Sequence, residues 1–120
     1  MNIIKVLQFL RPGTQWSCGQ DYDSLNWLDA STKPTLEELQ AAELPAEKAD
    51  RIAKVKQEAG NRILAAFPQF KQNNASLGLY DEAKTRAIKD GINAIRSASD
   101  AAEMAVNALQ TVEEVRAFTW

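Results

Sequence analysis

The chain of 120 residues has no histidine and a single cysteine, Cys18. Without histidine it lacks the side chain that most often acts as a general base, a neutral metal ligand or a pH switch. One cysteine can form neither a disulfide within the chain nor a cysteine zinc site, and a free thiol fits a reducing compartment. Glycine-rich phosphate-binding motifs are also missing. We therefore predict a protein that is not an enzyme and that has no cofactor.

Charge and hydrophobicity do not indicate a nucleic-acid or membrane partner. The 14 basic and 16 acidic residues give a net charge of −2, so no broad attraction to polyanions is expected. No segment approaches the roughly 18 consecutive apolar residues that a membrane-spanning helix needs. The apolar N-terminus ends in an Arg-Pro-Gly turn where a signal peptide would need small residues, so we interpret it as a strand.

Residues 1–33 are predicted to form a small antiparallel β-meander that acts as an attachment module. Its three strands are Ile3–Leu10, which is rich in β-branched residues, Thr14–Cys18 and Leu25–Leu28, separated by turn-forming sequences. A meander of this size cannot bury both of its faces alone. Two interpretations stay open: one face packs on the chain's own helices, or one face docks onto a partner.

A polar linker at residues 29–34 leads into a helical module, residues 34–120. Thr35 and Glu38 form a capping box that starts the first helix. We expect Pro45 to interrupt this helix and to open a second one over about residues 46–67. A further helical segment, Gln69–Leu77, should end at Gly78, a natural C-terminal cap.

The next helix starts at Asp81 and carries a heptad seam, in which small or apolar residues recur at intervals of four and three. The positions of the seam are Ile88, Ile92, Ile95, Ser99, Ala102, Val106 and Leu109. An undrifted 3.5-residue repeat favours a supercoiled contact, with the partner helix either in the same chain or in another. A second capping box at Thr111 starts a short last helix, and the terminal Trp120 is expected to pack or to dock.

Other candidate sites have simpler structural interpretations. Asp21, Asp23 and Asp29 lack the spacing of a calcium-binding loop, so we interpret them as turn residues. The basic residues of positions 48–62 alternate with acids, as on a solvated helix face. Trp16 and Trp27 could stack on a ligand, but two tryptophans on one meander more often form a small core or an interface anchor.

Two groups of motifs resemble small proteins of tailed bacteriophages. The C-terminal helical module common in phage tail proteins is similar to this chain at residues 67–74 (FPQFKQNN), 94–103 (AIRSASDAAE) and 112–115 (VEEV). Small proteins encoded among tail-fibre genes open in a similar way to residues 10–13 (LRPG), 25–28 (LNWL) and 33–35 (KPT). The resemblance covers most of the chain, but it does not include a long fibre shaft.

The resemblance implies a structural protein of the virion tail, a tail-fibre or baseplate subunit assembled in the host cytoplasm. It implies other phage tail proteins as partners and a homo-oligomer, with a trimer favoured. The alternative is a tail-fibre assembly chaperone that is not retained in the virion. The predicted fold class is α+β, mostly α: a short N-terminal antiparallel β-meander followed by a helical bundle or coiled-coil-like helices. The interface candidates are Phe9, Trp16, Trp27, Ile88, Ile92, Ile95, Val106, Leu109 and Trp120.

Overall fold

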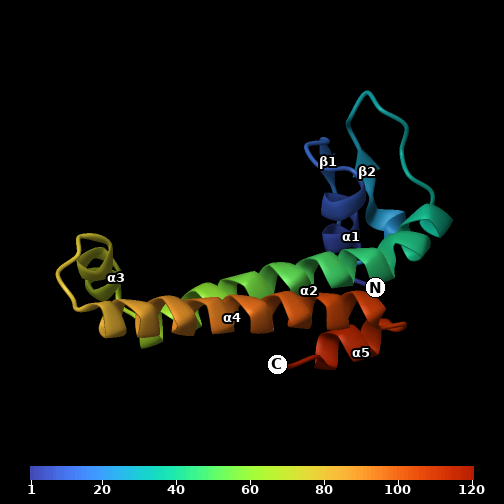
Figure 1. Ribbon diagram of the computed structural model, residues 1–120. Helices are drawn as coiled ribbons and strands as arrows, with labels where there is room; N and C mark the ends of the chain where they lie inside the picture. The colour runs from blue at the N-terminus through green and yellow to red at the C-terminus, as the bar shows by residue number, and fades with distance from the viewer. The chain divides into compact units, whose positions relative to one another are not determined.

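The computed structural model describes residues 1–120 and is mostly helical, with one two-stranded antiparallel sheet near the N-terminus (Figure 1). This confirms the predicted α+β, mostly α class. The elements in chain order are α1 (Ile3–Leu10), β1 (Trp16–Ser17), the 3-10 helix η1 (Tyr22–Ser24), β2 (Asn26–Trp27), α2 (Leu36–Ala66), α3 (Gln69–Ser76), α4 (Glu82–Ala108) and α5 (Val112–Ala117).

The chain forms two compact units. Unit 1 consists of residues 1–50 and 110–117, and unit 2 consists of residues 51–109 and 118–120. The predicted attachment module, residues 1–33, therefore lies entirely within unit 1, together with the first part of α2 and with α5.

The segment Ile3–Leu10 is a helix, so the prediction of a first strand there is wrong. The Asn2 side chain caps this helix by accepting a hydrogen bond from the Lys5 backbone N–H at 3.1 Å. Ile3, Val6 and Leu7 fall on one helical face and are all buried. The burial of this stripe outweighs the modest preference of β-branched residues for strands.

The sheet is accordingly a two-stranded hairpin and not a three-stranded meander. Trp16 of β1 lies opposite Trp27 of β2 in the antiparallel register, and strands were correctly predicted around both residues. The core of unit 1 contains buried residues of α1, the hairpin and α2: Ile3, Val6, Leu7, Leu25, Leu39, Ala42 and Ala46.

Pro45 lies inside α2 and does not interrupt it, contrary to the prediction. A proline in a helix removes the hydrogen bond to the carbonyl four residues earlier, which here belongs to Ala41. Both Pro45 and Ala41 are exposed, so water can hydrate that carbonyl. Meanwhile Leu39, Ala42 and Ala46 are buried, and an unbroken helix keeps them on one stripe. The predicted Thr35 cap is present, because the Glu38 N–H donates to the Thr35 hydroxyl at 3.1 Å, whereas the Glu38 carboxylate accepts from Arg11 at 3.5 Å.

In unit 2, residues 51–66 of α2 and the helix α4 run side by side, and α3 lies at one end of this pair (Figure 1). An ion pair of 3.6 Å between Lys56 Nζ and Glu103 Oε1 joins the two long helices. Asp81 caps α4 as predicted, accepting a hydrogen bond from the Lys84 N–H at 2.7 Å. Gly78 has a φ of +73° just after α3, which confirms its predicted role as a C-terminal cap.

Two helical glycines provide a matched test of the packing in unit 2. A Cβ added at Gly91 of α4 would overlap the ring of Phe67, whereas a Cβ added at Gly60 of α2 meets nothing within 4 Å. Alanine replaces a poor helix former at either site, a gain of about 1 kcal/mol. We expect Gly60→Ala to raise the free energy of unfolding by about 0.5–1 kcal/mol. We expect Gly91→Ala to lower it by about 1–2 kcal/mol, because displacing the ring costs more than the helix gains.

Thermal or urea unfolding followed by circular dichroism measures both changes. A second substitution, Phe67→Leu, removes the ring and should bring back much of the stability lost in Gly91→Ala. If Gly91→Ala stabilises the protein as much as Gly60→Ala does, the close contact between Gly91 and Phe67 does not exist in solution.

Candidate functional site

The predicted heptad seam of α4 is largely covered within the single chain. Ile88, Ser99, Ala102 and Val106 are buried, and Val106 has no exposed surface. The remaining seam positions, Ile92, Ile95 and Leu109, are half-buried. At the middle of the seam, Ser99 of α4 shares a shallow depression with Ala59 of α2, so the small residues allow these helices to approach closely.

Of the predicted anchors in unit 1, Trp16 and Trp27 are half-buried and pack against the core of the unit. The Trp27 indole also donates a hydrogen bond to the Ser31 carbonyl at 2.7 Å, which holds the following loop. Phe9 differs from both tryptophans, because 44% of its surface is exposed on α1. The structure therefore brings Trp16 and Trp27 together as part of a small core and leaves Phe9 outside it.

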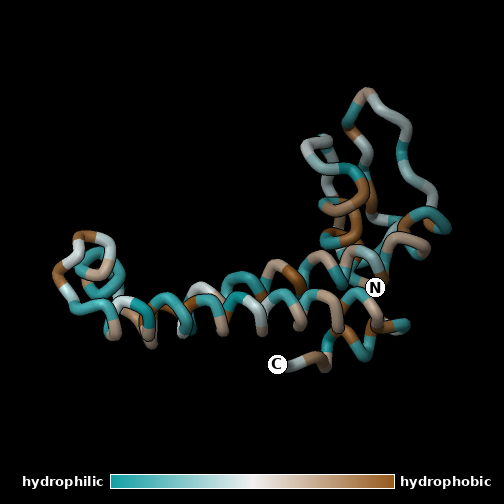
Figure 2. Tube along the Cα trace, viewed as in Figure 1, coloured by the Kyte–Doolittle hydropathy of each residue, from teal (hydrophilic) through white to brown (hydrophobic).

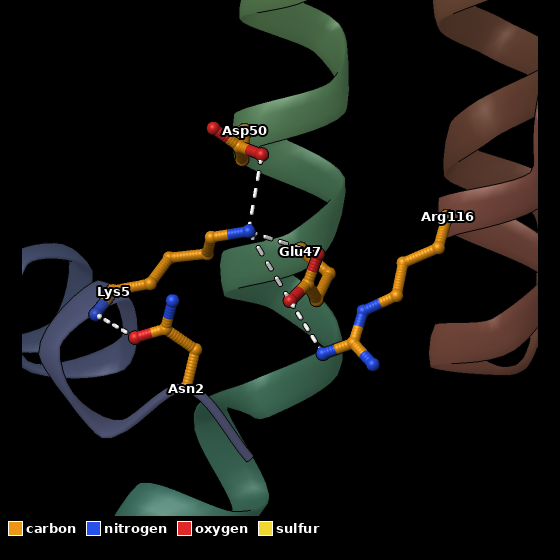
Figure 3. Close-up of polar contacts among 5 residues, drawn as sticks. All are labelled: Asn2, Lys5, Glu47, Asp50 and Arg116. Carbon is orange, nitrogen blue, oxygen red and sulfur yellow. Dashed lines mark hydrogen bonds and ion pairs between the residues drawn. The ribbon is translucent and has the colours of Figure 1, made fainter. Parts of the chain in front are cut away.

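A buried carboxylate, Glu47 of α2, ties three elements of unit 1 together (Figure 3). Only 4% of Glu47 is exposed. Lys5 of α1 donates to both of its oxygens at 3.3 Å, and Arg116 of α5 donates to one of them at 3.0 Å. Lys5 also reaches Asp50 at 3.2 Å, so two cations and two anions balance within the cluster.

The electrostatics of this cluster favour a structural role over acid–base chemistry. Burial acts to raise the pKa of Glu47, but the hydrogen bonds from Arg116 and Lys5 outweigh it and hold the pKa below its ordinary value. A general base that works near neutral pH needs a raised pKa and free access to a proton donor. Glu47 has neither property, since its oxygens are already occupied by cations.

The C-terminal residues of unit 2 are held against α2 by two arginines. Arg51 donates to the Phe118 carbonyl at 3.1 and 2.9 Å, and Arg62 donates to the Trp120 main-chain oxygen at 2.7 Å. The Arg62 guanidinium also stacks on the Trp120 ring, 3.8 Å from its centroid. The Trp120 indole donates to Glu58, and this bond, followed by that from Arg51, lowers the pKa of Glu58. Trp120 thus packs within its own unit and is half-buried.

Three of the five large apolar side chains that are exposed in unit 2 gather on α3 and the turn after it. Phe70 is 59% exposed, Leu77 is 73% exposed and Leu79 is 66% exposed. Figure 2 shows this turn as a hydrophobic segment at the end of the helical pair. Phe70 and Leu77 are seven residues apart and so lie on the same side of the helix. We call these three residues the α3 stripe.

Two aspartates of the N-terminal turns, Asp21 and Asp29, accept local hydrogen bonds. Asp21 caps η1 by accepting from the Ser24 N–H at 3.0 Å. Asp29 accepts from Ser31 and from the Gln15 N–H, and these bonds lower the pKa of its carboxyl group. No group of three or more potential ligand side chains is arranged to hold a metal ion. No helix combines the length and apolar character needed to cross a membrane.

No protein-family model matches the chain, and no curated protein or solved structure shows significant similarity to it.

Sequence reasoning did not single out the α3 stripe or the Glu47 cluster as sites. A signal for the stripe is present, because Phe70 lies in the first turn of a polar helix of eight residues and Leu77 follows its last residue, and so short a helix offers little surface to cover them. Glu47 carries no such signal. Its partners stand 42 and 69 positions away, and only the folded unit brings them together.

Proposed function

We propose that this protein is a structural component of a bacteriophage tail, a tail-fibre or baseplate subunit that acts through protein–protein contacts. The proposal is supported by the resemblance of residues 67–74, 94–103 and 112–115 to phage tail modules. The observation that carries it is the α3 stripe, in which Phe70, Leu77 and Leu79 are each more than half exposed. Uncovered clusters of large apolar residues commonly mark sites where another protein binds.

A homotrimer remains part of the proposal and rests on the resemblance alone. Four of the seven seam residues are buried within one chain, so the seam is a poor candidate for contacts between copies. The α3 stripe and the exposed Phe9 of unit 1 are the better candidates. Light scattering coupled to size-exclusion chromatography measures the mass directly, and a trimeric mass is the expected result.

The second candidate function is a tail-fibre assembly chaperone, which the same α3 stripe also favours because such a protein must offer apolar surface before assembly. Quantitative mass spectrometry of purified virions separates the two. Peptides of this chain should be present in particles at a fixed ratio to other tail proteins. Their absence from particles, together with their presence in the infected cell, would reject the structural role in favour of the chaperone.

Substitution of the stripe gives the matching prediction on binding. We expect Phe70→Ser/Leu77→Ser/Leu79→Ser to lower incorporation into particles at least about tenfold, because a few apolar anchors commonly supply most of the binding free energy. The free energy of unfolding should change by less than about 0.5 kcal/mol per site, since all three side chains are exposed.

Met104→Ser is the control, since Met104 is 73% exposed on α4 and lies outside the stripe. It should leave both incorporation and stability unchanged. Normal incorporation of the triple variant would show that the α3 stripe is not the binding surface.

A further inference from the structure

A groove of about 370 Å³ lies between α3 and α4 inside unit 2. Its floor contains Ile88, which is 7% exposed, and the half-buried Ile92, with Ala75 of α3 on the opposite wall. The α4 side of the lining extends from Thr85 to Arg96, which corresponds to about 17 Å of helix. The groove is therefore as long as about three turns of a bound helix and offers that helix an apolar floor.

The charged side chains that line this groove are Lys89 and Arg96, both basic. Neither side chain makes an ion pair, a side-chain hydrogen bond or a contact with an aromatic ring. Other cations of unit 2 do have acidic, carbonyl or aromatic partners: Arg51, Lys56, Arg62, Lys84 and Arg86.

We infer that this groove binds an α-helix of another protein, one whose apolar stripe is flanked by acidic side chains. The apolar stripe would lie on Ile88, Ile92 and Ala75, as in other helix-in-groove complexes. The flanking carboxylates would pair with the cations that the fold leaves without partners, which gives orientation and selectivity. The inference concerns the chemistry of the partner and does not rest on the assignment to a phage tail.

A second copy of this chain fits the groove less well. In a symmetric pair, each groove would present its own Lys89 and Arg96 to the other copy, and like charges across an interface oppose association. The acids Glu82 and Asp90 of α4 line an adjoining depression that shares Ala75, Thr85 and Lys89 with this groove, and neither acid lines the groove itself. Charge complementarity therefore selects an acidic partner.

The test uses the full chain, labelled for NMR, and two synthetic helical peptides of about 16 residues, long enough to hold some helix in water. Both carry leucines at intervals of three and four. Glutamates flank the leucines in one peptide, and lysines take the place of these glutamates in the other. We expect the acidic peptide to shift the backbone signals of Ala75, Ile88 and Ile92, and to bind more weakly as the salt concentration rises.

Reversal of the groove's charge completes the experiment. Lys89→Glu/Arg96→Glu should lower the affinity for the acidic peptide at least about tenfold. The same variant should bind the lysine peptide more tightly than the unmodified chain does. The control Gln57→Glu/Asn61→Glu adds two negative charges at exposed positions of α2, the same change in net charge as Lys89→Gln/Arg96→Gln, and should alter affinity by no more than about twofold. A neutral variant, Lys89→Gln/Arg96→Gln, should bind the acidic peptide with an intermediate affinity. It keeps the test valid if the charge-reversed variant does not fold.

Three results would overturn the inference. One is the absence of binding by the acidic peptide, and another is equal binding by the unmodified chain and by the charge-reversed variant. The third is a set of shifts confined to Phe70, Leu77 and Leu79, which would place the peptide on the α3 stripe and not in the groove.

Discussion

Replacing Val106 by aspartate is expected to destabilise the helical pair of unit 2 by at least about 4 kcal/mol. Val106 is fully buried in the single chain, so the substitution removes an apolar contact and places a carboxylate where no water reaches. Burial of an unpaired charge is among the few changes that commonly exceed this size. Since a domain of this length has a total stability of about 5–15 kcal/mol, we expect loss of most helical signal on mild heating.

The control for this experiment is Met104→Asp, two residues away on α4. Met104 is 73% exposed, and its replacement should change the free energy of unfolding by less than about 0.5 kcal/mol. Circular dichroism and light scattering together read the outcome. If Val106→Asp instead converts a larger assembly into folded monomers, the seam packs between copies of the chain and not within a single chain.

The helical module shows what local sequence can determine. The caps at Thr35, Asp81 and Thr111 were predicted from residue type, and each is present in the structure. Capping depends on side-chain and backbone atoms three residues apart, so the information is local. The glycine at position 78 belongs to the same class, because its positive φ reflects an intrinsic backbone freedom.

The segment Ile3–Leu10 shows where local propensity fails. Its isoleucines and valine favour strands, yet Ile3, Val6, Leu7 and Leu10 also satisfy the spacing of an amphipathic helix. The two patterns cannot be ranked without knowing which surface covers the segment. In the folded chain three of these residues enter the core of unit 1, with Leu10 packed against it, and tertiary burial decides in favour of the helix.

The position of Pro45 inside a helix and the functional surfaces could not be predicted from the sequence, for a related reason. Whether a proline ends a helix depends on whether water can reach the carbonyl it leaves unpaired, which is a property of the fold. The groove between α3 and α4 depends in the same way on how the chain returns after Gly78. Its cations, Lys89 and Arg96, were not identified from the sequence, because their lack of partners is visible only in three dimensions.

Replacing Glu47 by alanine is expected to lower the free energy of unfolding by about 2 kcal/mol at neutral pH. The substitution leaves a buried gap and removes the shared acceptor of Lys5 and Arg116. Breaking a fully buried ion pair costs about 3–5 kcal/mol, but Lys5 is 30% exposed and Arg116 is 52% exposed, so water compensates for part of the loss. Asp50 remains as a partner for Lys5, which reduces the cost further.

The pH dependence distinguishes loss of this charge from loss of packing alone. The pKa of Glu47 is lower in the folded state than its ordinary value of 4.5, so ionised Glu47 stabilises the fold above that value. This contribution disappears as the pH falls below 4.5 and through the lowered pKa. Glu47→Gln keeps the size of the side chain but cannot ionise, so its stability should fall less steeply in this range.

Chemical unfolding at a series of pH values between about 7 and 2.5 tests this difference, with the stability of each variant compared with the unmodified chain. The curves should converge at the acid end, because Glu47 of the unmodified chain is then protonated too. A change that removes no titratable group provides the control: Met104→Ser, at an exposed position of α4, should leave the steepness unchanged. Parallel curves for Glu47→Gln and the unmodified chain would show that α1, α2 and α5 are held together by apolar packing, with the charges of Lys5 and Arg116 contributing little.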